Sequence, residues 1–175
     1  GEIVISDDLT IQGPGAATLA IARNITAPLA RIFNITAVNV TINDLTLKNG
    51  YAPAGERGGA ILNAGALTIN RSVFDSNQAS LSGGAIRSSG TLNITNTTFS
   101  NNTAKDGGGG AIVNTGPATI QNCIASGNKA EYAGTATAAD GGAFYNAAPG
   151  TMNVSTSTIS GNTAVWGGGG IANTG

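Results

Sequence analysis

The sequence predicts an all-β fold, a right-handed parallel β-helix of about six coils with roughly 25 residues each. Three observations predict it: a recurring glycine-rich block, an alternating apolar strand pattern and a column of asparagines. The block is Gly-Gly-Ala-Ile in three copies, Gly-Gly-Ala-Phe in a fourth and Gly-Gly-Gly-Ile in a fifth. The copies end at Ile61, Ile86, Ile112, Phe144 and Ile171, which are 25, 26, 32 and 27 residues apart. A period in this range is typical of a solenoid, in which each repeat packs only against its neighbours.

The strands come from a second pattern inside each copy, the apolar alternation of a half-buried strand. The alternating pairs are Val40 and Ile42, Leu67 and Ile69, Leu92 and Ile94, Ala118 and Ile120, and Met152 and Val154. A further inward position follows five residues later, at Leu47, Phe74, Phe99, Ala125 and Ile159. With the glycine block as a third strand, we expect three short strands per coil. Strands stacked about 4.8 Å apart would form a rod on the order of 30 Å long, and the chirality of parallel crossovers predicts right-handed winding.

Two columns of polar residues are predicted to hold the coils in register. One stands three residues after the inward position, at Asn77, Asn102, Asn128 and Asn162. The other is expected at the turn after the glycine block, at Asn63, Asn114, Asn146 and Asn173, with Ser88 in the second copy. Turns leave backbone N–H and C=O groups that need partners away from water, and an inward carboxamide can supply them. Each such bond contributes about 0.5–1.5 kcal/mol, whereas an orphaned buried amide costs about 1–3 kcal/mol. We therefore interpret both columns as a structural ladder.

The chain is predicted to be a single β-helix domain over residues 1–175. Residues 1–39 form a divergent N-terminal coil and residues 40–175 form the regular repeats. We expect either a segment of a longer protein or a subunit that stacks on copies of itself, because open strand edges are templates for pairing. The first strand, Gly1–Ile5, has the alternation of the Leu-x-Ile strands (Leu67 and Ile69, Leu92 and Ile94), and we expect it to complete the last coil of another copy. The candidate contacts for this head-to-tail association are Ile3, Ile5, Ile171 and Asn173.

Composition excludes several classes of function. Charged residues make up 10% of the chain, well below the roughly 25% of a typical soluble domain. The net charge of −1 gives no electrostatic reason to expect nucleic acid or an anionic membrane as a partner. No stretch approaches the ~18 apolar residues of a membrane span, so no membrane insertion is expected. The single cysteine, Cys123, cannot form an internal disulfide, and we expect a small buried thiol there.

We expect no catalytic residue, no cofactor and no metal site. The chain has no histidine, which removes the commonest proton shuttle, and its carboxylates are scattered. Glycoside cleavage needs two carboxyl groups roughly 5–9.5 Å apart. Only Asp106 and Asp140 are expected at one corner of successive coils, and both precede glycine runs, where Asp usually forms a turn. Asp does not recur at the short spacing of a calcium-binding roll. A carbohydrate-cleaving β-helix remains the alternative.

Two surfaces are candidates for recognition. The loops between each ladder asparagine and the next glycine block emerge at one corner, and variable loops on a rigid scaffold often carry recognition. Tyr132 and Trp166 lie in two of these loops and are candidate partner contacts, for instance with sugars. The outward face of the apolar strands is a ladder of Thr and Asn, including Thr68 and Thr119, which resembles the faces of ice-binding solenoids. Carbohydrate binding and ice binding therefore stay open as alternatives.

The glycine block and a Phe-x-x-Asn motif together resemble the repeats of chlamydial polymorphic outer-membrane proteins. The first motif stands at Gly58–Ile61, Gly83–Ile86 and Gly109–Ile112, and the second at Phe74–Asn77 and Phe99–Asn102. The resemblance covers roughly residues 40–175. It implies a parallel β-helix in a secreted bacterial protein, extracellular or on the cell surface. The implied role is a non-catalytic rod, adhesin stalk or filament subunit, with a host or matrix glycan or protein as the partner.

Overall fold

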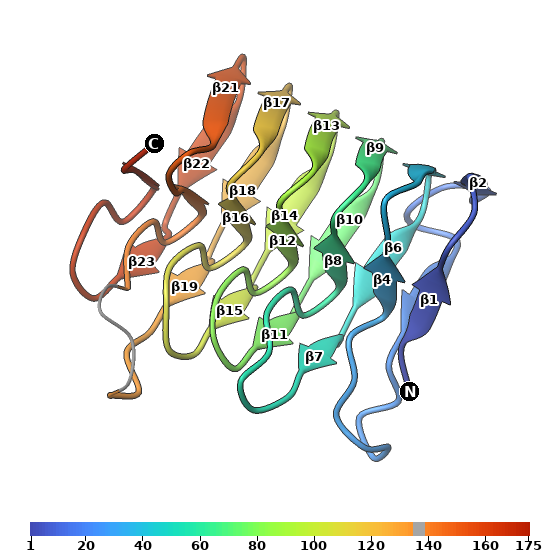
Figure 1. The fold of residues 1–175 in the computed structure, drawn as a ribbon, viewed down its shortest axis with the longest axis horizontal. Coiled ribbons are helices and arrows are strands. Elements are labelled where there is room, and N and C mark those ends of the chain that lie inside the picture. The colour runs from blue at the N-terminus through green and yellow to red at the C-terminus, as the bar shows by residue number, and fades with distance from the viewer. Residues whose placement is uncertain (135–138) are drawn as a thin grey trace.

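A computed structural model describes residues 1–134 and 139–175 of the chain. These residues form 24 short strands and no helix, and every strand pair is parallel. Figure 1 shows the coils side by side along the long axis, with the first strand at one end and the last coil at the other. The predicted fold class is confirmed: the protein is an all-β parallel solenoid of about six turns.

Four parallel sheets run along the rod, each built from one strand per coil, and we call them sheets A to D. Sheet A contains β1 (Ile3–Ile5), β4 (Phe33–Ile35), β8 (Ile61–Asn63), β12 (Ile86–Ser88), β16 (Ile112–Asn114), β20 (Phe144–Asn146) and β24 (Ile171–Asn173). Sheet B contains β2 (Leu9–Gln12), β5 (Asn39–Asn43), β9 (Ala66–Asn70), β13 (Thr91–Thr95), β17 (Pro117–Gln121) and β21 (Thr151–Ser155).

Sheets C and D complete each coil. Sheet C contains β3 (Ala20–Ala22), β6 (Thr46–Lys48), β10 (Val73–Asp75), β14 (Thr98–Ser100), β18 (Ile124–Ser126) and β22 (Thr158–Ser160). Sheet D contains the two-residue strands β7 (Tyr51–Ala52), β11 (Gln78–Ala79), β15 (Thr103–Ala104), β19 (Lys129–Ala130) and β23 (Thr163–Ala164).

Sheet D corrects the expectation of three strands per coil. Four of its five strands directly follow a ladder asparagine, where the sequence predicted loops. Two residues are too short to show the alternation that identifies a strand. The inward residue of each pair is alanine, with Ala52, Ala79 and Ala104 fully buried. The recognition loops therefore begin after this fourth strand and not at the asparagine.

Like residues stack on like residues in the interior. Ile86 of β12 pairs with Ile61 of β8 on one side and with Ile112 of β16 on the other, and all three side chains are fully buried. In sheet C the rings of Phe74 and Phe99 are stacked with centroids 5.0 Å apart. A buried aliphatic or aromatic side chain contributes about 1.5–3 kcal/mol relative to exposure. The same apolar column, repeated coil by coil, therefore makes up the core of the rod.

The coils turn at corners of left-handed backbone conformation. Between sheets B and C the corner residues have φ of 57°, 48°, 52°, 52° and 47°, at Asp44, Arg71, Asn96, Asn122 and Thr156. Asn and Asp tolerate this region better than other non-glycine residues. The second glycine of each block has a different role. A Cβ on Gly84 would lie 2.1 Å from the carbonyl oxygen of Gly110 in the next coil, so only glycine allows the coils to approach there.

The N-terminal strand corrects a second expectation. Gly1–Ile5 was expected to match the Leu-x-Ile strands, but β1 pairs with β4 in sheet A, and the Leu-x-Ile equivalent is β2. Alternation alone cannot assign a strand to a sheet where the glycine block is missing. Continuing the register therefore aligns Ile3 with Ile171 and Ile5 with Asn173, so a stacked copy would add a coil and not complete one.

Candidate functional site

The first asparagine column forms a continuous hydrogen-bond ladder. The backbone N–H and the Nδ2 of Asn77 both donate to Oδ1 of Asn102, at 3.0 Å each. Asn102 donates in the same two ways to Asn128, at 3.0 and 2.9 Å, and Asn128 to Asn162, at 2.9 Å each. The second Nδ2 hydrogen of Asn102 reaches the carbonyl oxygen of Phe74. Because every buried carboxamide is saturated in this way, the column has a structural role.

The second column bonds in a similar way but at a different place in the coil. Asn63, Asn114, Asn146 and Asn173 are not turn residues, since each ends a strand of sheet A. Asn114 donates to Oδ1 of Asn146 at 2.9 Å, and Asn146 donates to Asn173 at 2.7 Å. Asn63 donates to Oγ of Ser88 at 2.9 Å and also bonds the turn at Gly65. These side chains fix the turn from the preceding strand.

The loop corner beyond sheet D brings the two predicted contact residues together. The rings of Tyr132 and Trp166 have centroids 5.1 Å apart and are tilted by 38°. Their side chains are 43% and 54% exposed, respectively. They follow β19 and β23, the orange and red strands whose loops leave the rod at this corner in Figure 1. Sequence reasoning named both residues but missed their contact. The signal was present, because each lies four residues after its ladder asparagine, Asn128 or Asn162.

Polar groups surround this aromatic pair. Lys105 forms an ion pair with Glu131 of the neighbouring coil, with 3.0 Å between Nζ and Oε2. The backbone N–H of Ala133 donates to Oδ1 of Asp106 at 2.9 Å. The carboxylate of Asp140 lies against Gly167, where it leaves no room for a Cβ. The predicted loop over residues 129–140 also includes residues 135–138, which lie outside the described part of the chain.

The two aspartates considered for catalysis are in different environments. Asp106 is buried, with 6% of its surface exposed, and accepts a hydrogen bond from the loop backbone. Asp140 is only half-buried. In residues 1–134 and 139–175, no group of three or more His, Cys, Asp or Glu side chains could hold a metal ion.

The pKa of the Asp44 carboxyl group, at the corner between sheets B and C, is strongly lowered. Two guanidinium hydrogen bonds from Arg71, both 2.7 Å, lower the pKa of Asp44 to about 2, with help from Gln12. Hydrogen bonds from Asn39 likewise lower the pKa of Asp8. A carboxyl group acting as a general acid near neutral pH needs a raised pKa, so neither group is suited to that role. Both instead connect neighbouring coils through their hydrogen bonds.

Cys123 occupies the polar position at the corner before sheet C. It is buried, and its Sγ donates to the carbonyl oxygen of Gln121 at 3.2 Å. The hydroxyls of Ser72, Thr97 and Ser157 make the equivalent bond in their coils. Burial raises the pKa of the Cys123 thiol, which disfavours the reactive thiolate.

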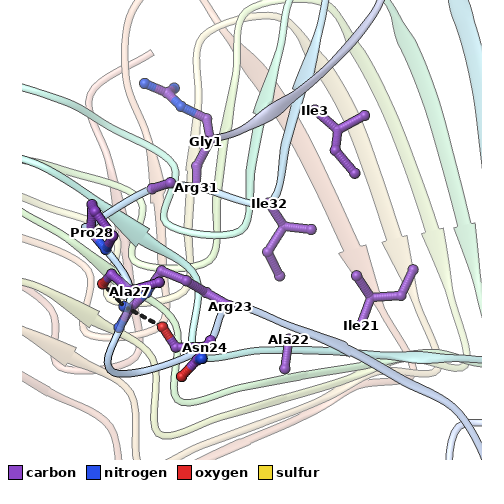
Figure 2. Close-up of a pocket in the computed structure, with 11 residues that line it drawn as sticks. Gly1, Ile3, Ile21, Ala22, Arg23, Asn24, Ala27, Pro28, Arg31 and Ile32 are labelled. Atoms are coloured by element: carbon purple, nitrogen blue, oxygen red, sulfur yellow. Dashed lines mark hydrogen bonds between the residues drawn. The ribbon is translucent and has the colours of Figure 1, made fainter.

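A cavity of about 260 Å³ lies in the N-terminal coil. Figure 2 shows Ile3, Ile21 and Ile32 on its apolar side, with Arg23 beside the turn at Asn24. The Arg23 guanidinium donates to three backbone carbonyls, and Arg31 is paired with two glutamates. The cavity borders the apolar interior of the first coil, in which sheet D has no strand.

Two segments, residues 71–89 and 96–115, match the family model of the Chlamydia polymorphic membrane protein repeat. The matched segments run from the β10 corner through β12 and from the β14 corner through β16, and so contain one Phe-x-x-Asn motif and one glycine block each. The recognition made from these motifs is therefore confirmed. Comparisons with curated proteins and with solved structures found no match. In the described residues, no helix is long and apolar enough to cross a membrane.

Proposed function

We propose that this chain is a non-catalytic rod of a bacterial cell surface, secreted and extracellular, that holds its loop corner away from the cell as an adhesin. The observation that carries the proposal is the match to polymorphic membrane protein repeats in strands that stack in unbroken register. The name of that family concerns membrane proteins of Chlamydia, and the surface location is carried over from it.

Rigidity supports the role of a rod. Sheets A, B and C each run through at least six coils without interruption. A saturated asparagine ladder opposes slippage, because a shift of one residue would turn the inward side chains outward. A stiff scaffold with short loops at one corner presents those loops in a fixed spacing, which favours recognition over flexible linking.

The two carboxyl groups whose pKa is known to change favour binding over cleavage. Of the described carboxylates with a resolved change, Asp8 and Asp44, both have a lowered pKa. Polysaccharide cleavage with a carboxylic acid as proton donor needs the opposite shift in one member of a close pair. We therefore prefer binding to cleavage.

Adherence of coated beads tests the proposal. Fluorescent beads carrying the purified chain should bind cultured epithelial cells or extracellular matrix above beads that carry an unrelated β-solenoid of equal density. Soluble chain in excess should compete with the beads. Equal binding of the two bead types would contradict the proposal, and so would turnover of a polysaccharide by the purified chain.

Head-to-tail contact between copies is a further part of the proposal. The N-terminal edge exposes Ile3 at 56%, and the C-terminal edge exposes Ile171 at 42%, whereas the equivalent Ile86 is fully buried. A copy stacked in register would cover both. Negative-stain microscopy and light scattering at rising concentration should show rods that lengthen, and an Ile171→Lys variant should prevent it. Monomers at all concentrations would contradict this contact.

Ice binding is a second candidate, favoured by the register of sheet B. All residues of its six strands are described, and none is charged. Its outward central column contains Thr10, Thr41, Thr68 and Thr119, interrupted by Asn93 and then followed by Asn153. Thermal hysteresis of the purified chain, lost in a variant with Thr68→Lys and Thr119→Lys, would support this function. No hysteresis in the parent chain would exclude it.

A further inference from the structure

We propose that Tyr132 and Trp166 form a stacking platform for an uncharged pyranose sugar. The inference rests on the proposed adhesive function and names the class of ligand that the loop corner would bind. It starts from the exposure of two large rings that touch each other and are not covered by other described parts of the chain.

The platform is held by the backbone of the rod. The N–H of Val165, next to Trp166, donates to the carbonyl oxygen of Ala130, and Trp166 N–H donates to Ala139. On the other side, Glu131 N–H donates to Ala104, which fixes the start of the Tyr132 loop. Both rings therefore leave the rod at matched positions on adjacent coils, so little conformational freedom is lost when a ligand binds.

The apolar area at this corner is small and isolated. Beyond the N-terminal coil, the large apolar side chains exposed in the described residues are Ile124, Tyr132, Val165, Trp166 and Ile171. Ile124 belongs to sheet C and Ile171 to sheet A, so the corner itself carries two rings and one valine. A stable protein interface covers about 800 Å² on each partner. One or two sugar rings fit this area far better than a protein does.

The polar groups around the rings suit an uncharged ligand with hydroxyls. Lys105 and Glu131 neutralise each other. Lys129 of β19 and Thr163 of β23 are register neighbours in sheet D, and both are exposed. The carboxylate of Asp140 borders Gly167. An anionic ligand would need an uncompensated group of cations. A pyranose presents one C–H face that can lie on an aromatic ring and a rim of hydroxyls that can bond to such side chains.

The single tryptophan of the chain makes the test direct, since all indole fluorescence comes from Trp166. The purified chain is titrated with lactose, N-acetyllactosamine, mannotriose, chitotriose and sialyllactose, each up to about 10 mM, a range that covers the affinity of weak sites. We expect a saturable fluorescence change with at least one neutral sugar. Tyr132→Ala should weaken that binding at least tenfold.

Saturation-transfer NMR follows the variants that lack the indole. Trp166→Ala should abolish transfer to the sugar, and Trp166→Phe should retain part of it. Tyr51→Ala is the matched control, because Tyr51 lies on the outer side of sheet D, three coils from the strand that precedes Tyr132, and this variant should bind normally. No saturable response to any sugar would overturn the inference, as would a response to sialyllactose alone or full binding by Trp166→Ala.

The bead assay separates this inference from the proposed function. Beads with the Tyr132→Ala and Trp166→Ala variant should lose adherence. If they adhere as well as the parent chain, the sugar platform is wrong while the adhesive rod stands. If the parent chain binds sugar but its beads do not adhere, the platform stands and the adhesive function is wrong.

Discussion

Removing one carboxamide from the centre of the asparagine ladder should destabilise the rod more than any surface change. Asn102 is fully buried and takes part in four side-chain hydrogen bonds, two as donor and two as acceptor. In Asn102→Ala, the backbone N–H of Asn77 loses its acceptor, and the carbonyl oxygen of Phe74 loses one donor but stays in the ladder between β10 and β14. Nδ2 of Asn77 keeps its bond to Leu47, and Oδ1 of Asn128 keeps the N–H of residue 102.

The size of the effect follows from the orphaned N–H of Asn77. One buried unsatisfied polar group costs about 1–3 kcal/mol, so we expect a loss of at least about 1–3 kcal/mol in the free energy of unfolding. Equilibrium urea unfolding followed by circular dichroism measures it. Asn93→Ala is the matched control, because Asn93 is exposed on the outer face of sheet B, and it should change stability by no more than about 0.5 kcal/mol. A loss below about 1 kcal/mol in Asn102→Ala would refute the view that the ladder satisfies otherwise orphaned groups.

Four further predictions follow from the packing, the close approaches and the titrating groups. Phe99→Ala should cost about 3–5 kcal/mol in urea unfolding, because the ring is fully buried between Phe74 and Phe144; a loss under 1 kcal/mol would contradict the stacked core. Gly84→Ala should prevent folding, since its Cβ would meet Gly110 O at 2.1 Å, whereas Gly107→Ala, with 3.3 Å to its nearest neighbour, should fold; equal circular dichroism spectra would contradict this. The pKa of Asp44 in the folded chain is lowered from its usual 3.8 to about 2. The contribution of this carboxylate to stability is therefore present above pH 3.8 and lost as the pH falls through about 2. Carboxyl NMR titration should place the midpoint near 2, and a midpoint near 3.8 would exclude the bond to Arg71. The buried Cys123 thiol should resist Ellman's reagent in the folded chain and react fully in urea, while rapid reaction without urea would contradict its burial.

The repeat period and the alternation were enough to predict the interior. The inward column of Phe74 and Phe99 could be assigned from the sequence because Phe-x-x-Asn recurs with a spacing that only stacked coils explain. The ladder asparagines could be assigned for the same reason. A residue that must fill the same buried position in every coil leaves a periodic trace in the sequence.

Features without such a trace were predicted incompletely. The two-residue strands of sheet D, such as Gln78–Ala79, are too short for alternation to appear. The first strand was assigned to the wrong sheet because its coil lacks the glycine block. The contact between Tyr132 and Trp166 crosses from one coil to the next, and it becomes predictable only when the two loops are aligned on Asn128 and Asn162.

Distances between spin labels test most directly whether successive coils lie on one another like with like. In a Cys123→Ser background, labels at Thr10 and Asn153 on the outer face of sheet B are separated by five strand spacings, or about 24 Å. Moving the first label from Thr10 to Thr41 removes one coil and should shorten the distance by about 5 Å. Pulsed electron paramagnetic resonance should find this step. A distance above about 35 Å, or one that does not shorten with the removed coil, would contradict the stacked solenoid.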